Sequence, residues 1–475
     1  MSSLVKILAL IAAAAFVAQA EAATDKIVCY FGSWSTYRNG NGKFSVENIN
    51  PHLCTHLIYT FVGINGDGSI NILDRWNEID LGAMRRFNDL KKQNPKLKTL
   101  IAIGGWNEGS LIFTKVVSND RLMENFANSA LLFMQEHGFD GFDLDWEYPA
   151  RRGGAATDKV NFSKMLKLFR KKFDETGKKY LLTAAVAGTG TAADLSYEVP
   201  ALNEYLDFVN LMAYDFHGSY DGVTGQNAPL YPSNVDLSLE AKERCVQASV
   251  EAWLARGLSP EKLVLGMGVY GRTFTLSNQA NNRVGAPVSN AGHQGPYTME
   301  AGMMGYNEIC EKILQGGWTE VWDEKQQVPY MYKGDQWVGY DNPKSIHIKV
   351  DYAKSLGLGG LMIWSVETDD FKGICGSKNP IQKEINSALD KSIPEEPEVP
   401  STTQTPKPEP QPTQPPTTGT KCSQEGYMRD PTNCAVFYYC KKNGSYFIQS
   451  EFKCAGNLVF DLDKLVCNYP SLVNC

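Results

Sequence analysis

Short runs of apolar residues recur along residues 26–365, and longer polar or amphipathic stretches separate them. Most runs are apolar on both faces, which is typical of buried parallel strands. Eight strands are predicted, at 26–31, 55–62, 99–104, 141–146, 181–187, 208–214, 263–270 and 360–365. Helical periodicity lies between them, for example at 79–93, 120–137 and 158–176.

The alternation of these strands and helices predicts an α/β fold, a (β/α)8 TIM barrel over residues 24–391. The interval between the seventh and eighth strands is much longer than the others. Its residues from about 273 to 340 are rich in Gly, Tyr and Trp, and they predict an inserted small α+β subdomain that walls one side of the active-site cleft. A doubly wound open sheet is the alternative, but no glycine-rich phosphate loop follows the first strand.

The composition of the 475-residue chain is that of a folded protein, with 43% hydrophobic and 21% charged residues. Its net charge of −7 argues against nucleic acid or anionic lipid as a partner. Residues 1–20 resemble a signal peptide, because Lys6 precedes an apolar run at 7–17 and small residues follow. That run is too short to span a membrane, so we expect a secreted, extracellular protein.

The cysteines and prolines divide the chain further. Residues 394–420 contain nine prolines, which predicts an extended linker. Six of the eleven cysteines then fall within residues 421–475, which predicts a small disulfide-stapled module. Spacing alone leaves fifteen possible connectivities. In an oxidising destination, Asn161 and Asn443 are candidate glycosylation sites.

The fourth predicted strand carries the most informative chemistry, in the stretch Phe-Asp-Gly-Phe-Asp-Leu-Asp-Trp-Glu-Tyr at 139–148. Side chains alternate along a strand, so Asp143, Asp145 and Glu147 share one face, which points into the barrel. Carboxylates crowded away from water should raise at least one pKa, so that a proton is retained near neutral pH. Glu147 lies at the carboxyl end of the strand, where barrel active sites form, and is the expected general acid.

A metal site or a solvent-facing acidic strand end is the alternative interpretation of these carboxylates. The six histidines are at positions 52, 56, 137, 217, 293 and 347, and none shows a paired metal-binding spacing. We therefore expect neither a metal nor a cofactor.

The Asp-Gly-x-Asp-x-Asp-x-Glu pattern at 140–147 resembles the family 18 glycoside hydrolases, the chitinases and chitinase-like lectins. Further matches lie in the same order on separate predicted strands, at 103–106 (Ile-Gly-Gly-Trp), 211–215 (Leu-Met-Ala-Tyr-Asp), 268–272 (Gly-Val-Tyr-Gly-Arg) and 359–365 (Gly-Gly-Leu-Met-Ile-Trp-Ser). The resemblance covers essentially all of residues 24–391.

The resemblance implies a retaining, substrate-assisted mechanism. Glu147 would protonate the glycosidic oxygen while the 2-acetamido carbonyl of the substrate attacks C1 and forms an oxazolinium ion. Asp145 would accept a hydrogen bond from the acetamido N–H, and Asp143 would share a proton with Asp145. Tyr214 would donate to the acetamido oxygen, and Asp215 would hold the ring of the cleaved sugar. Glu147 would then act as the base for water.

Aromatic residues at the strand ends are candidate platforms, because sugar rings stack their C–H faces on aromatic side chains. The expected substrate-binding residues are Tyr30, Trp34, Trp106, Asn107, Met212, Tyr270, Arg272, Glu300 and Trp364. The resemblance places Trp364 under the sugar at the cleavage point, with Trp34 and Trp106 on the non-reducing side. Core packing is the alternative for Tyr30 and Tyr270. Many family members have Trp at Tyr220, which leaves product length open.

The cysteine-rich tail resembles the peritrophin-A chitin-binding domain, carbohydrate-binding module family 14. The resemblance implies the pairs Cys422–Cys440, Cys434–Cys475 and Cys454–Cys467. In the barrel it implies Cys29–Cys54 and Cys310–Cys375, with Cys245 free and buried. Some of the tail aromatics Phe437, Tyr439, Phe447 and Tyr469 should stack on polymer, and Tyr469 is the candidate anchor. A zinc site is the alternative, but Cys-x-x-Cys pairs are absent.

These observations together predict a secreted, monomeric endochitinase that cleaves β-1,4 N-acetylglucosamine linkages in chitin and chitooligosaccharides. The alternatives are a non-catalytic chitin-binding lectin and a structural protein of a chitin matrix. Lectins of the family usually lose the acid, whereas Glu147 is present here with its supporting carboxylates.

Overall fold

The computed structural model of the protein describes residues 24–394 and, with gaps, residues 422–473. The predicted signal peptide and nearly all of the predicted linker lie outside the described residues. Contacts within the chain define two units, Met1–Pro394 and Glu395–Cys475, which are described separately. Among the described residues, no helix combines the length and apolar character needed to cross a bilayer.

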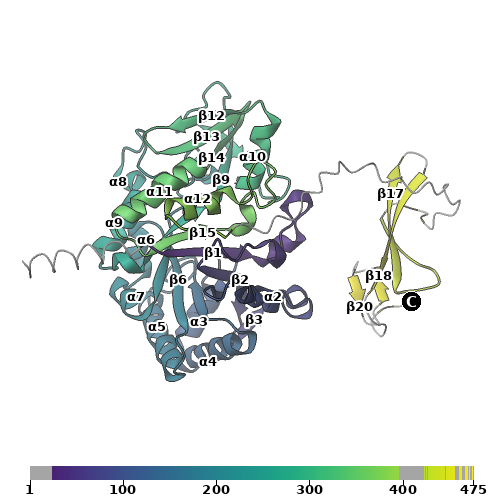
Figure 1. The fold of residues 1–475 in the computed structure, drawn as a ribbon, viewed down its shortest axis with the longest axis horizontal. Coiled ribbons are helices and arrows are strands. Elements are labelled where there is room, and N and C mark those ends of the chain that lie inside the picture. The colour runs from purple at the N-terminus through teal and green to yellow at the C-terminus, as the bar shows by residue number, and fades with distance from the viewer. Residues whose placement is uncertain are drawn as a thin grey trace, which may run out of the picture. The chain divides into compact units, whose positions relative to one another are not determined.

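The first unit is built around a closed barrel of eight parallel strands (Figure 1). The strands are β1 (Lys26–Gly32), β2 (His56–Ile64), β4 (Lys98–Gly104), β5 (Gly141–Asp145), β6 (Leu181–Ala187), β7 (Phe208–Met212), β8 (Leu263–Gly268) and β15 (Gly360–Trp364). Each pairs with its neighbour in chain order, and the pairing of β1 with both β2 and β15 closes the ring. A short strand β3 (Ile70–Ile72) pairs antiparallel with β2. The predicted (β/α)8 barrel is confirmed.

Helices cover the outside of this barrel. They are α2 (Ala83–Asp89), α3 (Leu111–Val117), α4 (Asp120–His137), α5 (Asp158–Glu175), α6 (Gly190–Ser196), α7 (Val199–Tyr205), α8 (Leu239–Lys242), α9 (Val246–Ala255), α11 (Pro343–Ser355) and α12 (Pro380–Ala388). Helix α4 has the predicted bounds because Asn119 caps its first turn through two backbone N–H groups and Gly138 ends it in the left-handed conformation.

One predicted helix, at 79–93, is wrong as a continuous element. Gly82 adopts a left-handed conformation (φ 69°) and separates a π-helical turn at Trp76–Asp80 from α2. A 3-10 turn at Leu90–Lys92 follows α2. The periodicity detected the apolar face that packs on the barrel, but it did not detect the break.

The predicted seventh strand, at 263–270, is two strands. Strand β8 ends at Gly268, and the backbone N–H of Val269 donates to the carbonyl of Trp364. Strand β9 (Tyr270–Leu276) then leaves the barrel and pairs antiparallel with β14 (Gln336–Gly339). The inserted subdomain therefore begins at Tyr270.

The insertion is a six-stranded antiparallel sheet with one helix, on one side of the barrel (Figure 1). Its other elements are β10 (Val288–Ala291), β11 (Met303–Gly305), α10 (Tyr306–Gln315), β12 (Thr319–Asp323) and β13 (Val328–Lys333). Its own core includes Phe274, Tyr330 and Trp337, and the last two rings stack at 5.1 Å. The insertion is a separately packed layer, which agrees with the predicted α+β character.

The tail unit contains a three-stranded antiparallel sheet, β16 (Gly426–Arg429), β17 (Val436–Asn443) and β18 (Tyr446–Lys453), and a hairpin, β19 (Val459–Asp461) and β20 (Val466–Asn468). Its small core centres on Tyr438, which is buried beside Cys440 and whose hydroxyl donates to Asp430 at 2.5 Å. Such a core gains from covalent staples.

Disulfides join Cys29 to Cys54, Cys310 to Cys375 and Cys422 to Cys440, and the free Cys245 is buried. Cys434 and Cys454 are also disulfide-bonded. Their expected partners, Cys475 and Cys467, lie outside the described side chains, as do Tyr469 and the side chain of Asn443. Asn161 is half-buried on α5.

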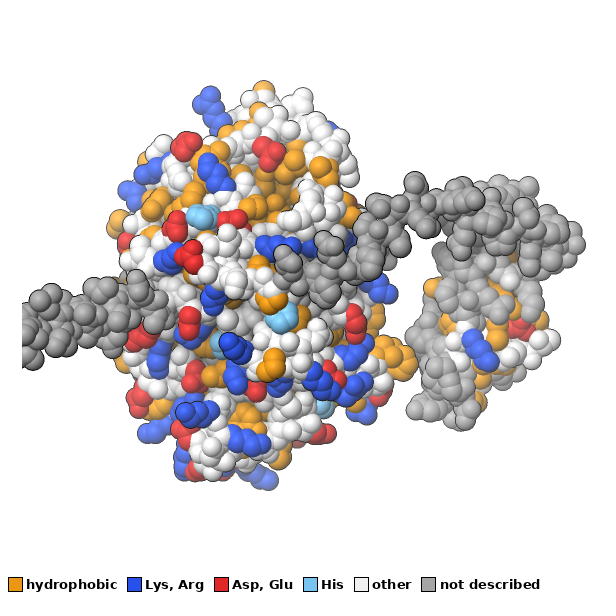
Figure 2. Space-filling model, in the orientation of Figure 1, with side chains coloured by type: hydrophobic (Ala, Val, Ile, Leu, Met, Phe, Trp, Pro, Cys, Tyr) orange, Lys and Arg blue, Asp and Glu red, His pale blue; other side chains and the backbone are white. Residues whose placement is uncertain are grey.

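Acidic and basic side chains are intermingled over the visible face of the barrel (Figure 2). Among the described residues, one cluster of possible metal-ligating groups occurs, at Cys310, Cys375 and Asp370. The two cysteines form a disulfide, and the Asp370 carboxylate accepts the N–H groups of Ile374 and Cys375. These groups are already engaged within the protein.

Candidate active site

A row of three carboxylates lies along the inside of β5 and just beyond its end. Asp143 is fully buried and Asp145 is 4% exposed, while Glu147 is less deeply buried. The intervening Trp146 points the other way, and its indole N–H donates to the Ser110 hydroxyl at 3.0 Å. Strand alternation therefore places the row on the inner face.

The end of β4 lies directly against this row. Gly105 donates its backbone N–H to the carbonyl of Asp145 at 2.8 Å. Gly104 has a φ of 110°, and a side chain there would collide with the same carbonyl oxygen. The glycine pair that precedes Trp106 is thus required for the close approach of the two strands.

Asp143 is the innermost acid and is surrounded by donors. It accepts hydrogen bonds from the Tyr30 hydroxyl at 2.8 Å, the Thr183 hydroxyl at 2.5 Å and the Asn210 amide at 3.4 Å. Burial raises the pKa of Asp143 to about 6, and these three hydrogen bonds oppose the rise. Asp143 is therefore built to hold a negative charge behind Asp145.

Asp145, in the middle of the row, has an unused acceptor. Among the side chains that the structure describes, none donates a hydrogen bond to its buried Oδ1. Burial, followed by the charges of Glu147 and Asp143, raises the pKa of Asp145 well above its usual range. Asp145 thus tends to hold a proton when the site is empty, and it presents an oxygen that a ligand donor could satisfy.

Glu147 is the outermost acid and is poised for proton transfer. Burial raises its pKa to about 7, the Asp215 carboxylate adds to the rise, and a hydrogen bond with Tyr148 opposes it. A carboxyl group with a pKa near 7 can both donate and accept a proton at neutral pH.

Another part of the site is formed by the segment that follows β7, which is two strands from β5 in the barrel. Asp215 has a left-handed backbone (φ 59°), and its N–H donates to the Asn227 side chain at 3.1 Å. Its Oδ1 accepts the Tyr270 hydroxyl at 2.7 Å and the Arg272 Nε–H at 2.7 Å. Half-buried Tyr214 precedes it, with its ring 6.1 Å from that of Tyr270. Residues of β9 in the insertion thus fix the acid at the end of β7.

Aromatic side chains form a cluster around the end of β15. The ring of Trp364 lies 5.6 Å from Tyr30, 5.8 Å from Phe61 and 6.1 Å from Trp34. Trp34 and Phe61 stack nearly parallel at 6.1 Å. Trp364 is partly exposed and Trp34 is exposed, so these two rings can offer a face to a sugar.

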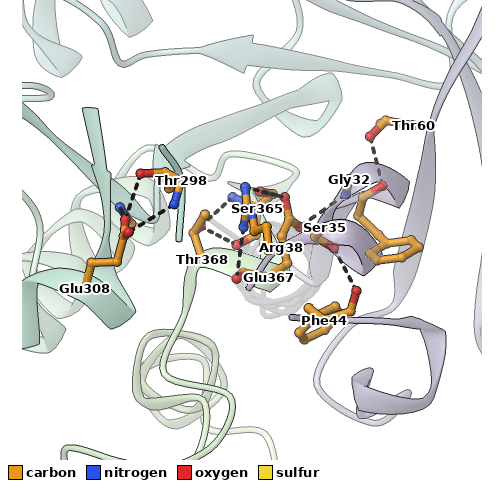
Figure 3. A network of polar contacts seen from close by, with 12 residues as sticks. Gly32, Ser35, Arg38, Phe44, Thr60, Thr298, Glu308, Ser365, Glu367 and Thr368 are labelled. Atoms are coloured by element: carbon orange, nitrogen blue, oxygen red, sulfur yellow. Dashed lines mark hydrogen bonds and ion pairs between the residues drawn. The ribbon is translucent and has the colours of Figure 1, made fainter. Parts of the chain in front are cut away.

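Glu367 lies among polar contacts with Gly32, Arg38 and Ser365, close to the ends of β1 and β15 (Figure 3). Its buried carboxylate accepts the Gly32 N–H at 3.1 Å and the Ser365 hydroxyl at 2.6 Å. The Arg38 guanidinium lies 4.0 Å away and also donates to the Glu367 carbonyl at 3.4 Å. One buried acid therefore ties the end of β1 to the end of β15.

Gly32 shows how tightly this support is packed. A Cβ atom at Gly32 would lie 2.7 Å from the Glu367 carboxylate and 2.7 Å from the Trp34 ring. Trp34 follows the end of β1, and Trp364 is the last residue of β15, so both tryptophans lie at the strand ends that Glu367 joins. Glu367 therefore links the positions of the two tryptophans through its contacts with the backbone and side chains at the two strand ends.

The structure corrects the expected role of two tyrosines. Tyr30 and Tyr270 are buried, at 1% and 2% exposure, so neither offers an open stacking face. Their hydroxyls instead hold Asp143 and Asp215. Core packing, the alternative weighed from the sequence, is the better description of both rings.

The other expected substrate-binding residues differ in how deeply they are buried. Met212 is buried in the barrel interior with Tyr214 and Trp364. Trp106 and Asn107 are exposed after β4, and Glu300 is exposed in the insertion. Tyr220 is 72% exposed, and its hydroxyl donates to the carbonyl of Asp215 at 3.3 Å.

Sequence reasoning missed several residues that hold the site. They are Thr183 and Asn210 beside Asp143, Asn227 beside Asp215, Phe61 in the aromatic cluster, and Glu367 beneath it. Thr183 and Asn210 did carry a signal, because each is a polar residue inside an otherwise apolar predicted strand. Glu367 carried none, because its partners Gly32 and Arg38 are distant in the sequence.

This fold and site place the chain in a known class of enzymes. Residues 26–369 match the family described as glycosyl hydrolases family 18, and residues 422–475 match the chitin binding Peritrophin-A domain. The protein therefore belongs to glycosyl hydrolase family 18, within its chitinases, and carries a C-terminal chitin-binding domain.

Individual relatives agree with this assignment. Mouse chitotriosidase-1 is 38% identical over 94% of this chain and 95% of its own length. The solved structure of Ostrinia furnacalis Group IV chitinase in complex with allosamidin is 44% identical, covers 77% of this chain and 99% of that chain, and has a TM-score of 0.75. Human YKL-39, described as a pseudo-chitinase that retains chitooligosaccharide binding, is 39% identical over 77% of this chain and 100% of its own, with a TM-score of 0.72.

Proposed function

We propose that the protein is a secreted endochitinase that hydrolyses β-1,4 linkages between N-acetylglucosamine units with retention at the anomeric carbon. The observation that carries this proposal is the buried pair of Asp145 and Glu147. Glu147 can deliver a proton near neutral pH, and Asp145 presents an acceptor without a protein donor among the described residues. The disulfides and the chitin-binding tail support secretion and anchoring on polymer.

The proposed first step cleaves the glycosidic bond without a protein nucleophile. Glu147 transfers its proton to the glycosidic oxygen as the bond from C1 to that oxygen breaks. The carbonyl oxygen of the 2-acetamido group forms a bond to C1, and the positive charge moves onto the resulting oxazolinium ring. Asp145 passes its proton to Asp143, accepts a hydrogen bond from the ring N–H and, as an anion, stabilises this charge.

The proposed second step restores the enzyme. Ionised Glu147 takes a proton from water, and the water oxygen attacks C1 and opens the ring. Two displacements at one carbon retain its configuration. Tyr214 and Asp215, which follow β7, would orient the acetamido oxygen and the sugar ring. Tyr270 and Arg272 hold Asp215 for this role.

The substrate itself provides the sharpest test of this function. Chitohexaose should be cleaved at least about a thousandfold faster than glucosamine or cellulose oligosaccharides of equal length, because only chitohexaose carries an acetamido nucleophile held beside C1. The measurement is product release by chromatography, with the anomer ratio followed by NMR in the first minutes. Comparable cleavage of the other two substrates would mean that the protein supplies the nucleophile, which would refute the mechanism.

The pH profile should follow the proton on Glu147. Its pKa is raised from 4.5 to about 7, so the acid form persists up to neutral pH and is lost above it. We expect kcat/KM on soluble chitooligosaccharide to fall roughly tenfold per pH unit above about pH 7. Initial rates from pH 4 to pH 9 check this expectation. A basic limb that begins near pH 4.5 would show that the pKa of the proton donor is not raised in the free enzyme.

A further inference from the structure

Arg152 contacts both the exposed Trp106 and the backbone of Glu147. It lies in the loop between β5 and α5, and its guanidinium carbon is 3.5 Å from the centroid of the Trp106 ring. Its Nη1 donates to the carbonyl of Trp106 at 2.8 Å and to the carbonyl of Glu147 at 3.0 Å. One side chain therefore contacts the ring and backbone of the exposed tryptophan and the backbone of the acid.

Trp106 needs such a restraint if it is to stack on a sugar. Its side chain is 59% exposed, and it follows two glycines with positive φ angles, Gly104 and Gly105. An exposed ring on such a turn loses conformational entropy when it stacks on a ligand. A guanidinium over one face lowers that loss and leaves the other face free for the C–H face of a sugar.

The backbone at Arg152 gives a second, independent observation. Its φ of 51° is in the left-handed region, which is strained for a residue with a Cβ atom. Gly153 and Gly154 follow immediately, so glycine is used freely in this loop. Ala150 in the same loop also has a positive φ, of 61°, so this conformation belongs to the loop as a whole, and it sets the direction from which the Arg152 side chain reaches Trp106 and Glu147.

We propose that Arg152 is a positioning residue that fixes Trp106 as a sugar platform on the backbone that carries Glu147, and so favours chitooligosaccharides long enough to reach Trp106. The inference rests on the proposed function, because it assigns Trp106 to the non-reducing side of the cleft. Lysine would be a poor replacement, because it lacks the planar guanidinium group that stacks on a ring.

The test compares Arg152→Gln with Arg151→Gln in the full-length protein. Arg151 is also exposed and carries the same charge, but its guanidinium lies over Tyr148 at 5.7 Å. For chitohexaose, Arg152→Gln should raise KM about tenfold with kcat within about threefold, and for chitotriose KM should change less than twofold. Arg151→Gln should leave both substrates unchanged. Equal effects on the two lengths would overturn the proposal.

A double-mutant cycle separates positioning of Trp106 from a direct contact with the sugar. If Arg152 acts through the ring, Arg152→Gln should add almost nothing to the KM increase caused by Trp106→Ala. Additive effects would overturn the proposal. Calorimetric binding of chitohexaose to the same four proteins, each also carrying Glu147→Gln, gives the answer without turnover. A wild type that binds chitohexaose but cleaves nothing would refute the proposed function while leaving this comparison decisive.

Discussion

Replacing Glu147 with glutamine should lower the rate of chitooligosaccharide hydrolysis by at least about a thousandfold. Glutamine keeps the shape of the side chain, but its amide has no acidic proton for the leaving oxygen and cannot take one from water. The wild-type group is tuned for both tasks, because burial and Asp215 raise its pKa to about 7. The measurement is the release of products from chitohexaose under single-turnover and steady-state conditions.

Two controls accompany this variant. Glu136→Gln removes the same charge from an exposed position on α4 and should retain wild-type activity. Both glutamine variants should sediment with insoluble chitin as well as the wild type does, whereas truncation after Pro394 should reduce sedimentation and spare cleavage of soluble substrate. Hydrolysis by Glu147→Gln at the wild-type rate would remove Glu147 from the mechanism.

The barrel could be predicted from the sequence because each of its strands is buried on both faces. A run such as Leu181–Ala187 has the same bounds in the sequence pattern and in the structure. The strand ends were less accurate, because Gly268 and Met212 end their strands where the chain turns to build the site. Apolar composition specifies burial, but it does not specify where hydrogen bonding to a neighbouring strand stops.

The acidic row could also be predicted, because its three members lie on one strand and follow the alternation of a single element. The environment of these three acids could not be predicted from the sequence. Tyr30, Thr183 and Asn210 come from three other strands, and only the closed barrel brings their donors to Asp143. Arg272 reaches Asp215 because β9 leaves the barrel directly after β8.

The electrostatic gradient along β5 follows from these long-range contacts. Three donors stabilise the charge of Asp143 at the inner end, and Asp145 has no donor to Oδ1 among the described residues. The proton in the empty site therefore favours Asp145 over Asp143, although the two side chains are chemically identical. When an acetamido N–H approaches Oδ1, the anion of Asp145 gains a partner and the balance shifts toward ionisation.

Because of this gradient, we expect a second large loss of activity in the variant Asp145→Asn. The variant should lower kcat on chitohexaose about 100-fold or more and change KM less than about threefold. An asparagine oxygen can still accept the acetamido N–H, so binding is largely kept. The amide carries no charge, however, and cannot stabilise the positive charge that develops on the oxazolinium ring. The lost interaction forms only in the transition state, so the variant should lower kcat and leave KM nearly unchanged.

The matched control is Asp120→Asn, which changes an exposed aspartate at the start of α4 and should leave kcat and KM unchanged. Thermal unfolding of the three proteins checks that Asp145→Asn folds. A variant that keeps more than half of wild-type kcat would show that the charge of Asp145 does not act on the reaction. A large rise in KM with kcat intact would show that Asp145 binds the ground state and transition state equally. Only a selective loss of kcat fits a carboxyl group that is protonated in the empty site and ionised when positive charge forms on the substrate.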